Sequence, residues 1–368
     1  MTDRDFMARA LFHARRAEGV TTPNPMVGAV VVDREGIVVG QGRHRRAGDR
    51  HAEVVALDEA GDRARDATLY VTLEPCCHSG RTGPCTRRVI SAGITRVVAA
   101  MIDPNPLVGG KGLAQLRDHG IAVEVGLLGE EAAHLNRAFV TVHSRGRPMV
   151  IAKAAASLDG RIAAVEGVRT LLTSAAANRR SQQLRAAVDA IGVGSGTILT
   201  DDPWLTVRDR LRSRPLTRVV FDRRLRTPPS ARVFSTLDAG PVIILARDGG
   251  HEAPDAAKDE TWLERRRALE AVGATVLAGT GDLGADIRLL LQWDISCLLV
   301  EGGATVHAAA WKAGLIDRVH VIVAPAWLGD RGVKLFDGLS IPLGTLMPLR
   351  VEPMGVDTWM EADVYGHH

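Results

Sequence analysis

The spacing of apolar residues along the chain changes repeatedly between the period of a helix and that of a strand. Residues 6–17 place apolar side chains every three or four positions, which predicts an amphipathic helix. Two apolar segments, 27–32 and 37–40, flank Asp33-Arg34-Glu35-Gly36, a pattern typical of a β-hairpin. Helices are then predicted at 51–60, 86–92, 112–118 and 130–142, and strands at 68–73, 95–101 and 121–125. This alternation predicts a layered α/β fold with a partly parallel sheet.

A short polar stretch with glycine and proline, residues 144–148, precedes a second series of elements. Ser174 is the predicted N-cap of a helix that reaches residue 187. Strands are predicted at 149–155, 190–193, 218–221, 242–246, 296–301 and 318–323, and a further helix at 304–313. Because 368 residues exceed the usual size of one hydrophobic core, we predict two α/β domains, residues 1–146 and 147–368.

Composition narrows the function classes. A net charge of +3 is too small to attract a polyanion strongly, so nucleic acid is not an expected partner. A local group of arginines, Arg43, Arg45, Arg46 and Arg50, favours a phosphorylated small molecule instead. No apolar run reaches about 18 residues and the first 19 residues are rich in charge, so we expect neither a membrane segment nor a signal peptide. Three of the four cysteines fall within ten positions, which favours metal binding or catalysis and a cytoplasmic protein.

Three short motifs predict a catalytic metal centre. They are His51-Ala52-Glu53 at a helix start, Glu74-Pro75-Cys76 at a strand end, and Cys85 before a helix. One histidine and two thiolates form a soft tetrahedral site that leaves one position open for water. Glu53 is close enough to move protons between that water and a departing amine without binding the metal. The pattern is typical of zinc deaminases that act on nitrogen heterocycles, so we predict Zn²⁺ held by His51, Cys76 and Cys85, with Glu53 as the catalytic acid and base.

The eight residues between Cys76 and Cys85 are more than the two that such deaminases usually have. We therefore expect a loop, supported by Gly80, Gly83 and Pro84, that returns Cys85 to the metal. Cys77 and His78 are competing ligands, which we interpret as bystanders or substrate-loop residues because adjacent residues rarely reach one ion together. In the second half, Lys153 shares a strand face with Ser157, and the glycine turns at 194–197 and 302–303 are candidate phosphate cradles.

With these motifs the chain resembles the bifunctional deaminase/reductase family of bacterial riboflavin biosynthesis. The matching N-terminal stretches are Pro23-Asn24-Pro25, Val27-Gly28, His51-Ala52-Glu53-Val54, Thr72-Leu73-Glu74-Pro75-Cys76, Gly80-Arg81-Thr82, Pro84-Cys85 and Asp103-Pro104-Asn105-Pro106. The resemblance implies a cytidine-deaminase-like, three-layer domain that removes the 2-amino group of 2,5-diamino-6-ribosylamino-4(3H)-pyrimidinone 5′-phosphate. It also implies that Asn24, Arg81 and Asn105 contact this phosphorylated pyrimidine.

The resemblance extends into the second half through residues 156–161, 200–203 and 300–303. It implies a reductase domain similar to dihydrofolate reductase that uses NADPH to reduce the ribosyl group to ribityl. The residues carried over for NADPH are Leu171, Thr197, Asp201 and Gly303. Those carried over for the ribosyl phosphate are the catalytic Lys153 together with Arg169, Arg185, Leu205, Arg208 and Glu301. We also expect a homo-oligomer.

Two alternatives stay open at this point. Leu171 stands where relatives commonly have tryptophan and Arg169 replaces a small polar residue, so the second domain is alternatively a non-catalytic scaffold attached to a zinc deaminase of another base or nucleotide. A deaminase acting on RNA or DNA is disfavoured by the weak net charge and by an aromatic content of only 4%, since single strands are bound by stacking on aromatic side chains.

Overall fold

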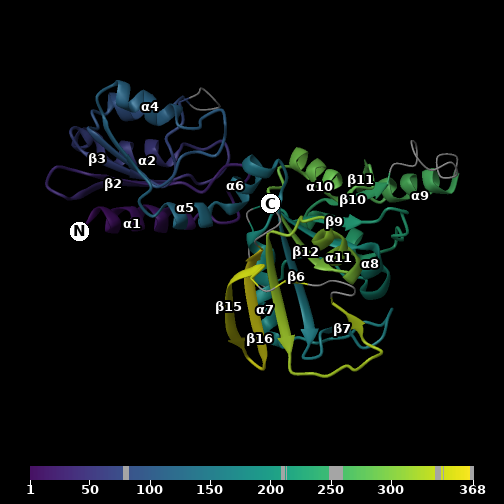
Figure 1. Ribbon diagram of the computed structural model, residues 1–368. Coiled ribbons are helices and arrows are strands. Elements are labelled where there is room, and N and C mark those ends of the chain that lie inside the picture. The colour runs from purple at the N-terminus through teal and green to yellow at the C-terminus, as the bar shows by residue number, and fades with distance from the viewer. Residues whose placement is uncertain are drawn as a thin grey trace. The chain divides into compact units, whose positions relative to one another are not determined.

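The computed structural model describes residues 1–77, 83–208, 212, 214–247, 260–335, 341–342 and 344–364. The chain divides into two compact units, Met1–Gly146 and Arg147–His368, called here the N-terminal and C-terminal units (Figure 1). Among the residues that are described, no helix has the length and apolar character needed to cross a membrane.

The N-terminal unit is a five-stranded sheet in the order β2-β1-β3-β4-β5. Its strands are β1 (Gly28–Val32), β2 (Val38–Arg43), β3 (Thr68–Val71), β4 (Arg96–Ala99) and β5 (Ala122–Val125). The predicted hairpin is confirmed, since β1 and β2 pair in antiparallel fashion, and β3, β4 and β5 run parallel to one another. Its helices are α1 (Asp3–Arg15), α2 (Ala52–Ala60), α3 (Cys85–Ser91), α4 (Lys111–Asp118), α5 (Gly129–Leu135) and α6 (Arg137–Arg145), with a short 3-10 turn at Gly61–Ala64.

Helices cover both faces of this sheet, which gives the three layers predicted from the sequence. Alternate residues of β1 enter different cores: Val31 packs with α2, α3 and α4, whereas Val30 packs with α1 and α5. Helix α2 lies so close to the sheet that a Cβ atom at Gly42 would fall 2.4 Å from the carbonyl oxygen of Ala52. Only glycine fits there, and this close packing fixes the helix that begins next to His51.

The single helix predicted at 130–142 is wrong, because the chain forms α5 and α6 with Asn136 between them. Asn136 is 3% exposed. Its side chain accepts a hydrogen bond from the backbone N–H of Met26 at 2.7 Å and donates one to the carbonyl of Met26 at 2.9 Å. The break in the helix therefore ties the segment next to Asn24 to the body of the unit.

The C-terminal unit contains a nine-stranded sheet in the order β11-β10-β9-β8-β12-β6-β13-β16-β15. The first seven strands of that order are parallel, and β16 and β15 add an antiparallel edge. The strands are β6 (Met149–Ser157), β8 (Ala190–Gly194), β9 (Thr217–Phe221), β10 (Val242–Arg247), β11 (Ala274–Gly279), β12 (Cys297–Gly302), β13 (Arg318–Ala324), β15 (Leu346–Met354) and β16 (Asp357–Val364), and a separate small sheet pairs β7 (Arg161–Ala163) with β14 (Val333–Lys334). The helices are α7 (Ala175–Ala187), α8 (Ser195–Asp201), α9 (Glu260–Ala271), α10 (Leu283–Arg288) and α11 (Ala304–Lys312), with 3-10 turns at Arg232–Ala239 and Leu289–Trp293.

All six strands predicted in this unit are present, and Ser174 is the N-cap of α7, where its hydroxyl accepts from the N–H of Ala177. The sequence prediction missed α8, α9, α10, β7, β11, β14, β15 and β16. Helix α9 carries many charged residues, and β16 alternates buried and half-exposed positions that include Asp and Glu, so neither shows a long apolar pattern.

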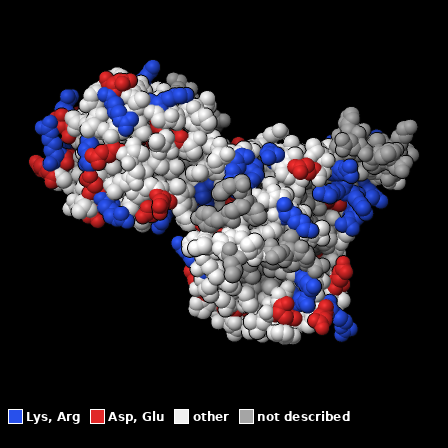
Figure 2. Space-filling model, viewed as in Figure 1, with Lys and Arg blue, Asp and Glu red and all other residues white. Residues whose placement is uncertain are grey.

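Charged side chains of both signs are interspersed over the N-terminal unit in the view of Figure 2. Within the arginine group singled out from the sequence, Arg50 pairs with Asp58 at 2.8 Å and Arg46 with Asp49 at 3.3 Å. These two arginines are therefore partly neutralised by acidic neighbours.

Candidate functional site

Three side chains that could bind a metal ion converge in the N-terminal unit. His51 is the N-cap residue of α2, Cys76 follows β3, and Cys85 is the first residue of α3. The Nδ1 atom of His51 lies 3.1 Å from Sγ of Cys85 and 3.5 Å from Sγ of Cys76. The three ligand atoms all lie within 4.8 Å of one another, which a single tetrahedral ion can bridge.

Glu53 lies beside this group, in the first turn of α2, and is 3% exposed. Burial raises the pKa of Glu53 to about 7, although the charge of His51 opposes the rise. Its carboxyl group also interacts with the thiol of Cys85. A carboxyl group with a pKa near neutrality can both accept and return a proton, as general acid and base catalysis requires.

The protonation of the two thiols shows that the donor set suits a cation. Hydrogen bonding to Cys85 lowers the pKa of Cys76 to about 4, whereas hydrogen bonding to Cys76 raises the pKa of Cys85. By themselves the two sulfurs share one proton, because a second negative charge so close is unfavourable. A divalent cation removes this conflict, since both cysteines bind it as thiolates. The residues therefore fit zinc.

Asn24 is linked to the metal ligands through a histidine that sequence reasoning missed. The side-chain nitrogen Nδ2 of Asn24 lies 3.0 Å from Nε2 of His44, which directly follows β2 and is 2% exposed. The imidazole of His44 meets that of His51 edge to face, with ring centroids 5.4 Å apart. A lone histidine near a strand end is a weak signal, so only the folded chain reveals this contact.

Asn105 lies on the loop between β4 and α4. Its backbone N–H donates to the carboxylate of Asp103 at 2.8 Å, and its side-chain oxygen accepts from the N–H of Leu107 at 3.0 Å. Arg81 and His78, the two candidates on the cysteine loop, lie outside the described residues.

A buried charge cluster in the C-terminal unit joins three of the predicted site residues. Arg185 on α7 donates two hydrogen bonds to the Glu301 carboxylate on β12, at 2.7 and 2.8 Å. The ammonium group of Lys153 on β6 lies 3.8 Å from the same carboxylate. Burial raises the pKa of Glu301, but the positive charges of Arg185 and Lys153 outweigh it and hold the pKa at about 2. Burial lowers the pKa of Lys153, an effect that Glu301 opposes and Arg185 reinforces.

The other predicted residues of this unit fall into smaller groups. The hydroxyl of Thr197 is 3.7 Å from where a Cβ atom at Gly303 would lie, so α8 packs against the glycine turn after β12. Burial raises the pKa of Asp201 and the charge of Arg169 opposes the rise, so these two interact.

Leu205, Arg208 and Leu171 complete the predicted set. Arg185 also donates to the carbonyl of Thr206 at 3.1 Å, which connects the charge cluster to the segment of Leu205 and Arg208. Leu205 is buried, whereas Leu171 is 82% exposed.

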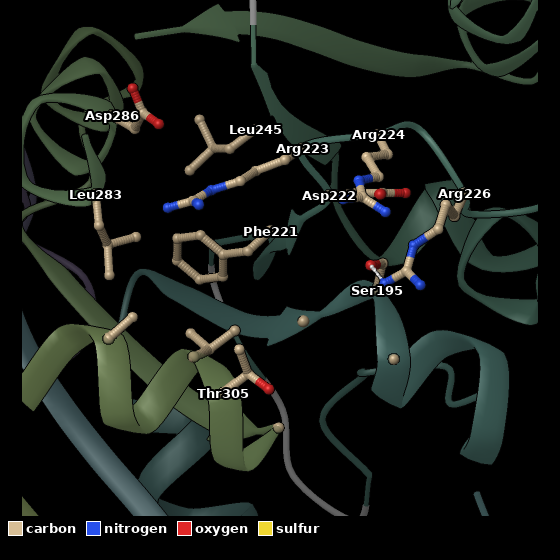
Figure 3. A pocket seen from close by; sticks show the side chains of 15 residues that line it. Ser195, Phe221, Asp222, Arg223, Arg224, Arg226, Leu245, Leu283, Asp286 and Thr305 are labelled. Atoms are coloured by element: carbon tan, nitrogen blue, oxygen red, sulfur yellow. Dashed lines mark hydrogen bonds between the residues drawn. The ribbon is translucent and has the colours of Figure 1, made fainter. Parts of the chain in front are cut away.

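A cavity of about 360 Å³ opens at the carboxyl ends of the parallel strands β8, β9 and β12 (Figure 3). It contains both predicted glycine turns, represented by Gly194 and Gly303. Ser195 of the predicted 194–197 turn also lines it, whereas sequence reasoning missed Phe221, Asp222, Arg223, Arg224, Arg226, Leu283 and Thr305. Arg223 and Arg224, which follow β9 closely, were the signal in the sequence that could have indicated this cavity. Such an edge of an open α/β sheet is the usual place for a nucleotide.

Family models match both units of the chain. Residues 1–101 match the cytidine and deoxycytidylate deaminase zinc-binding region, and residues 148–360 match the RibD C-terminal domain. The chain belongs to the RibD family. Riboflavin biosynthesis protein RibD of Aquifex aeolicus is 41% identical over 92% of this chain and 89% of its own length, and that of Escherichia coli is 41% identical over 92% and 93%.

Solved RibD structures match nearly the full length of the chain. Acinetobacter baumannii RibD superposes with a TM-score of 0.86 at 34% identity, covering 99% of both chains. A Thermotoga maritima diaminohydroxyphosphoribosylaminopyrimidine deaminase/5-amino-6-(5-phosphoribosylamino)uracil reductase gives 0.82 at 32% identity, covering 98% of both. The chain is thus a bifunctional RibD deaminase/reductase of riboflavin biosynthesis, with a zinc-binding deaminase domain and a reductase domain that uses a nicotinamide cofactor. The predicted cytidine-deaminase-like and dihydrofolate-reductase-like folds are confirmed.

Proposed function

We propose that the chain removes the 2-amino group of 2,5-diamino-6-ribosylamino-4(3H)-pyrimidinone 5′-phosphate and then reduces the ribosyl group of the product to ribityl with NADPH. The observation that carries the first step is the convergence of His51, Cys76 and Cys85 next to a buried Glu53. The observation that carries the second is the buried cluster of Lys153, Arg185 and Glu301.

In the deamination, Glu53 takes a proton from the attacking water and delivers it to the amino group, which leaves as ammonia. Zinc, when held by the three side chains, would act as a Lewis acid that lowers the pKa of water, so that a hydroxide nucleophile is available at neutral pH. Asn24, oriented by His44, and Asn105 hold the pyrimidine, and Arg81 is a further contact on the cysteine loop. The pKa of Glu53 near 7 supports its role, because a group that exchanges protons in both directions works best close to the operating pH.

In the reduction, Lys153 donates hydrogen bonds to the ribosyl group and fixes its reacting carbon for hydride transfer. Glu301 holds Lys153 and Arg185 in place, because both cations share its carboxylate. Arg169, Arg185, Leu205 and Arg208 surround the ribosyl phosphate in this proposal. A fixed pose lowers the barrier because orientation is achieved before the reaction begins.

We assign the nicotinamide dinucleotide to the cavity at β8, β9 and β12, with Thr197, Asp201, Gly303 and Leu171 as neighbours. Three arginines support NADPH over NADH, since a 2′-phosphate needs cationic partners. Arg223 donates to the carbonyl of Gly281 at 3.0 Å and Arg226 to the hydroxyl of Ser195 at 2.9 Å. Arg224 makes no hydrogen bond through its guanidinium to any residue that the structure describes, which leaves it available for the phosphate.

The cofactor assignment is tested with Arg224→Gln in the full chain. The KM for NADPH should rise about tenfold or more, the loss of one charge-assisted hydrogen bond, while the KM for NADH stays unchanged. Arg288→Gln, an exposed change on α10, is the matched control. Equal effects on both cofactors would contradict the assignment.

The overall reaction is tested by supplying the diaminopyrimidine, with and without NADPH, and identifying products by mass. Glu53→Gln should abolish deamination and keep one zinc per chain. A metal chelator should stop only the first step, so reduction of the deaminated uracil intermediate should continue in its presence. A chain that binds NADPH and never forms the ribityl product would favour the scaffold alternative.

The exposed edge strand β15 supports a homodimer. Seven consecutive residues, 347–353, are exposed, and Leu349 and Val351 are 52% and 54% exposed. An exposed edge strand has unpaired backbone groups that can pair with another strand, and a two-fold axis at Val351 would place Arg350 opposite Glu352 of the second copy. Light scattering should give twice the chain mass for the wild type and one chain mass for Val351→Glu. Val356→Glu, in the exposed turn beyond the strand, should leave the mass unchanged.

The need for Cys76 and Cys85 as free thiolates supports a reducing compartment, so we propose a cytoplasmic enzyme.

A further inference from the structure

Glu74 is a buried carboxylate that has no role in the mechanism above. It follows β3, precedes Cys76 by two residues and is 3% exposed. Four backbone N–H groups donate to it: those of Asp103 at 3.1 Å and Gly110 at 2.8 Å to Oε2, and those of Gly112 at 2.8 Å and Leu113 at 3.2 Å to Oε1.

Two of these donors belong to the first turn of α4. The first N–H groups of a helix have no partner inside the helix, and the N-cap residue Gly110 has no side chain to accept them. Glu74 accepts from Gly112 and Leu113, the second and third residues of α4. Its negative charge also lies at the positive end of the helix dipole. Glu74 therefore caps α4 from a neighbouring strand.

The other two donors lie at the ends of the loop that carries Asn105. Inside the loop, the N–H of Asn105 donates to the side chain of Asp103, and the carbonyl of Asn105 accepts from Val108 and Gly109, both at 2.9 Å. Since Glu74 accepts from Asp103 at one end and Gly110 at the other, it holds this hydrogen-bonded loop at both ends.

The helix also packs directly on the segment that leads to the metal ligand. A Cβ atom at Gly112 would fall 2.0 Å from the carbonyl oxygen of Pro75, so only glycine allows this approach. Pro75 is the residue between Glu74 and Cys76. The Asn105 loop, the start of α4 and the Cys76 turn therefore meet at one carboxylate.

We propose that Glu74 is a positioning residue for deamination, which fixes the Asn105 loop relative to Cys76 so that the pyrimidine meets the metal centre in one pose. The proposal rests on the contact between Asn105 and the pyrimidine proposed above. Glu74 acts through backbone groups. A displacement of about 1 Å in a positioning element can cost about 100-fold in rate, so the effect should be large.

The test is Glu74→Gln in the full chain. Glutamine has the same shape, but an NH₂ group replaces one carboxylate oxygen of Glu74. That NH₂ group can only donate, so it cannot accept the two backbone N–H hydrogen bonds that the oxygen accepts. We expect kcat/KM for deamination to fall about 100-fold, mostly through KM, with one zinc per chain retained. The retained zinc would show that the N-terminal unit is folded, and reduction of the deaminated intermediate by the same sample should be unchanged, which would show that the C-terminal unit is folded. Glu124→Gln, an exposed change on β5, is the matched control and should behave as wild type.

A double-mutant comparison separates positioning from general support of the fold. Asn105→Ala by itself tests whether Asn105 contacts the pyrimidine. If Glu74 acts through Asn105, then Glu74→Gln should cost less than about threefold in the Asn105→Ala background. If Glu74→Gln does not fold, Glu74→Asp keeps the charge on a shorter side chain and should give a smaller loss with the same non-additivity.

Three results would overturn the proposal. They are unchanged kcat/KM in Glu74→Gln, loss of zinc together with activity, and losses that multiply fully in the double variant. Failure of the wild type to deaminate the pyrimidine would instead refute the proposed substrate, and a silent Asn105→Ala would refute the contact on which the positioning rests.

Discussion

Replacing Glu301 by glutamine should destabilise the C-terminal unit by about 3–5 kcal/mol, the usual cost of leaving buried charges without their partner. The Glu301, Arg185 and Lys153 side chains are 7%, 16% and 13% exposed. After the change, Arg185 keeps its bond to the carbonyl of Thr206, but neither cation keeps an anionic partner within the cluster. The pKa of Lys153, already lowered by burial, should fall further because Glu301 is the charge that raises it.

Urea unfolding of the full chain followed by tryptophan fluorescence measures this loss. All six tryptophans lie in the C-terminal unit, so the signal reports on that unit alone. With a denaturant slope of about 3 kcal/mol per M, the midpoint should move down by about 1 M or more. Glu270→Gln is the matched control, because its ion pair with Arg266 is exposed and should contribute less than about 1 kcal/mol.

We also expect strong energetic coupling between Glu301 and Arg185. Arg185→Met in the Glu301→Gln background removes the unpaired cation, so the double variant should be less destabilised than the sum of the single variants. Two results would refute the view that an uncompensated buried charge dominates the loss of stability. One is a urea midpoint of Glu301→Gln equal to that of the Glu270→Gln control, and the other is a double variant whose loss of stability equals the sum of the two single losses.

Three further outcomes are expected. Cys77→Ser should keep one zinc per chain and its deaminase activity, whereas Cys85→Ser should lose both, as measured by elemental analysis and by an activity assay. The reverse result would mean that Cys77 and not Cys85 is the zinc ligand. Asn136→Ala should lower the melting temperature of the N-terminal unit in calorimetry, because it removes the partner of the half-buried N–H and C=O groups of Met26, at a cost of up to about 1–3 kcal/mol each. An unchanged melting temperature would mean that water replaces the amide. Since the pKa of Glu301 falls from 4.5 to about 2 on folding, its contribution to stability is present above pH 4.5 and is lost as the pH falls through about 2, so the acid dependence of the tryptophan-monitored stability should be shallower in Glu301→Gln.

The sequence by itself determined the local features. The period of the apolar residues located the five strands of the N-terminal unit and six strands of the C-terminal unit, because burial on one face of a strand or helix leaves a repeating pattern. The ligand set His51, Cys76 and Cys85 was predicted because each sits at the end of a predictable element and the three residue types together suit one metal. The predicted helix at 130–142 failed because Asn136 bonds to Met26, a residue 110 positions away.

Tertiary structure alone decided which contacts the distant residues make with one another. Lys153, Arg185 and Glu301 form one cluster because β12 lies next to β6 in the sheet, and sequence order does not specify which strands are neighbours. Glu74 shows the same limit, since its partners are backbone N–H groups, which every residue except proline carries and which therefore leave no mark in the sequence. The chemistry of each group follows from the sequence, whereas its partner depends on the folded arrangement of the sheet.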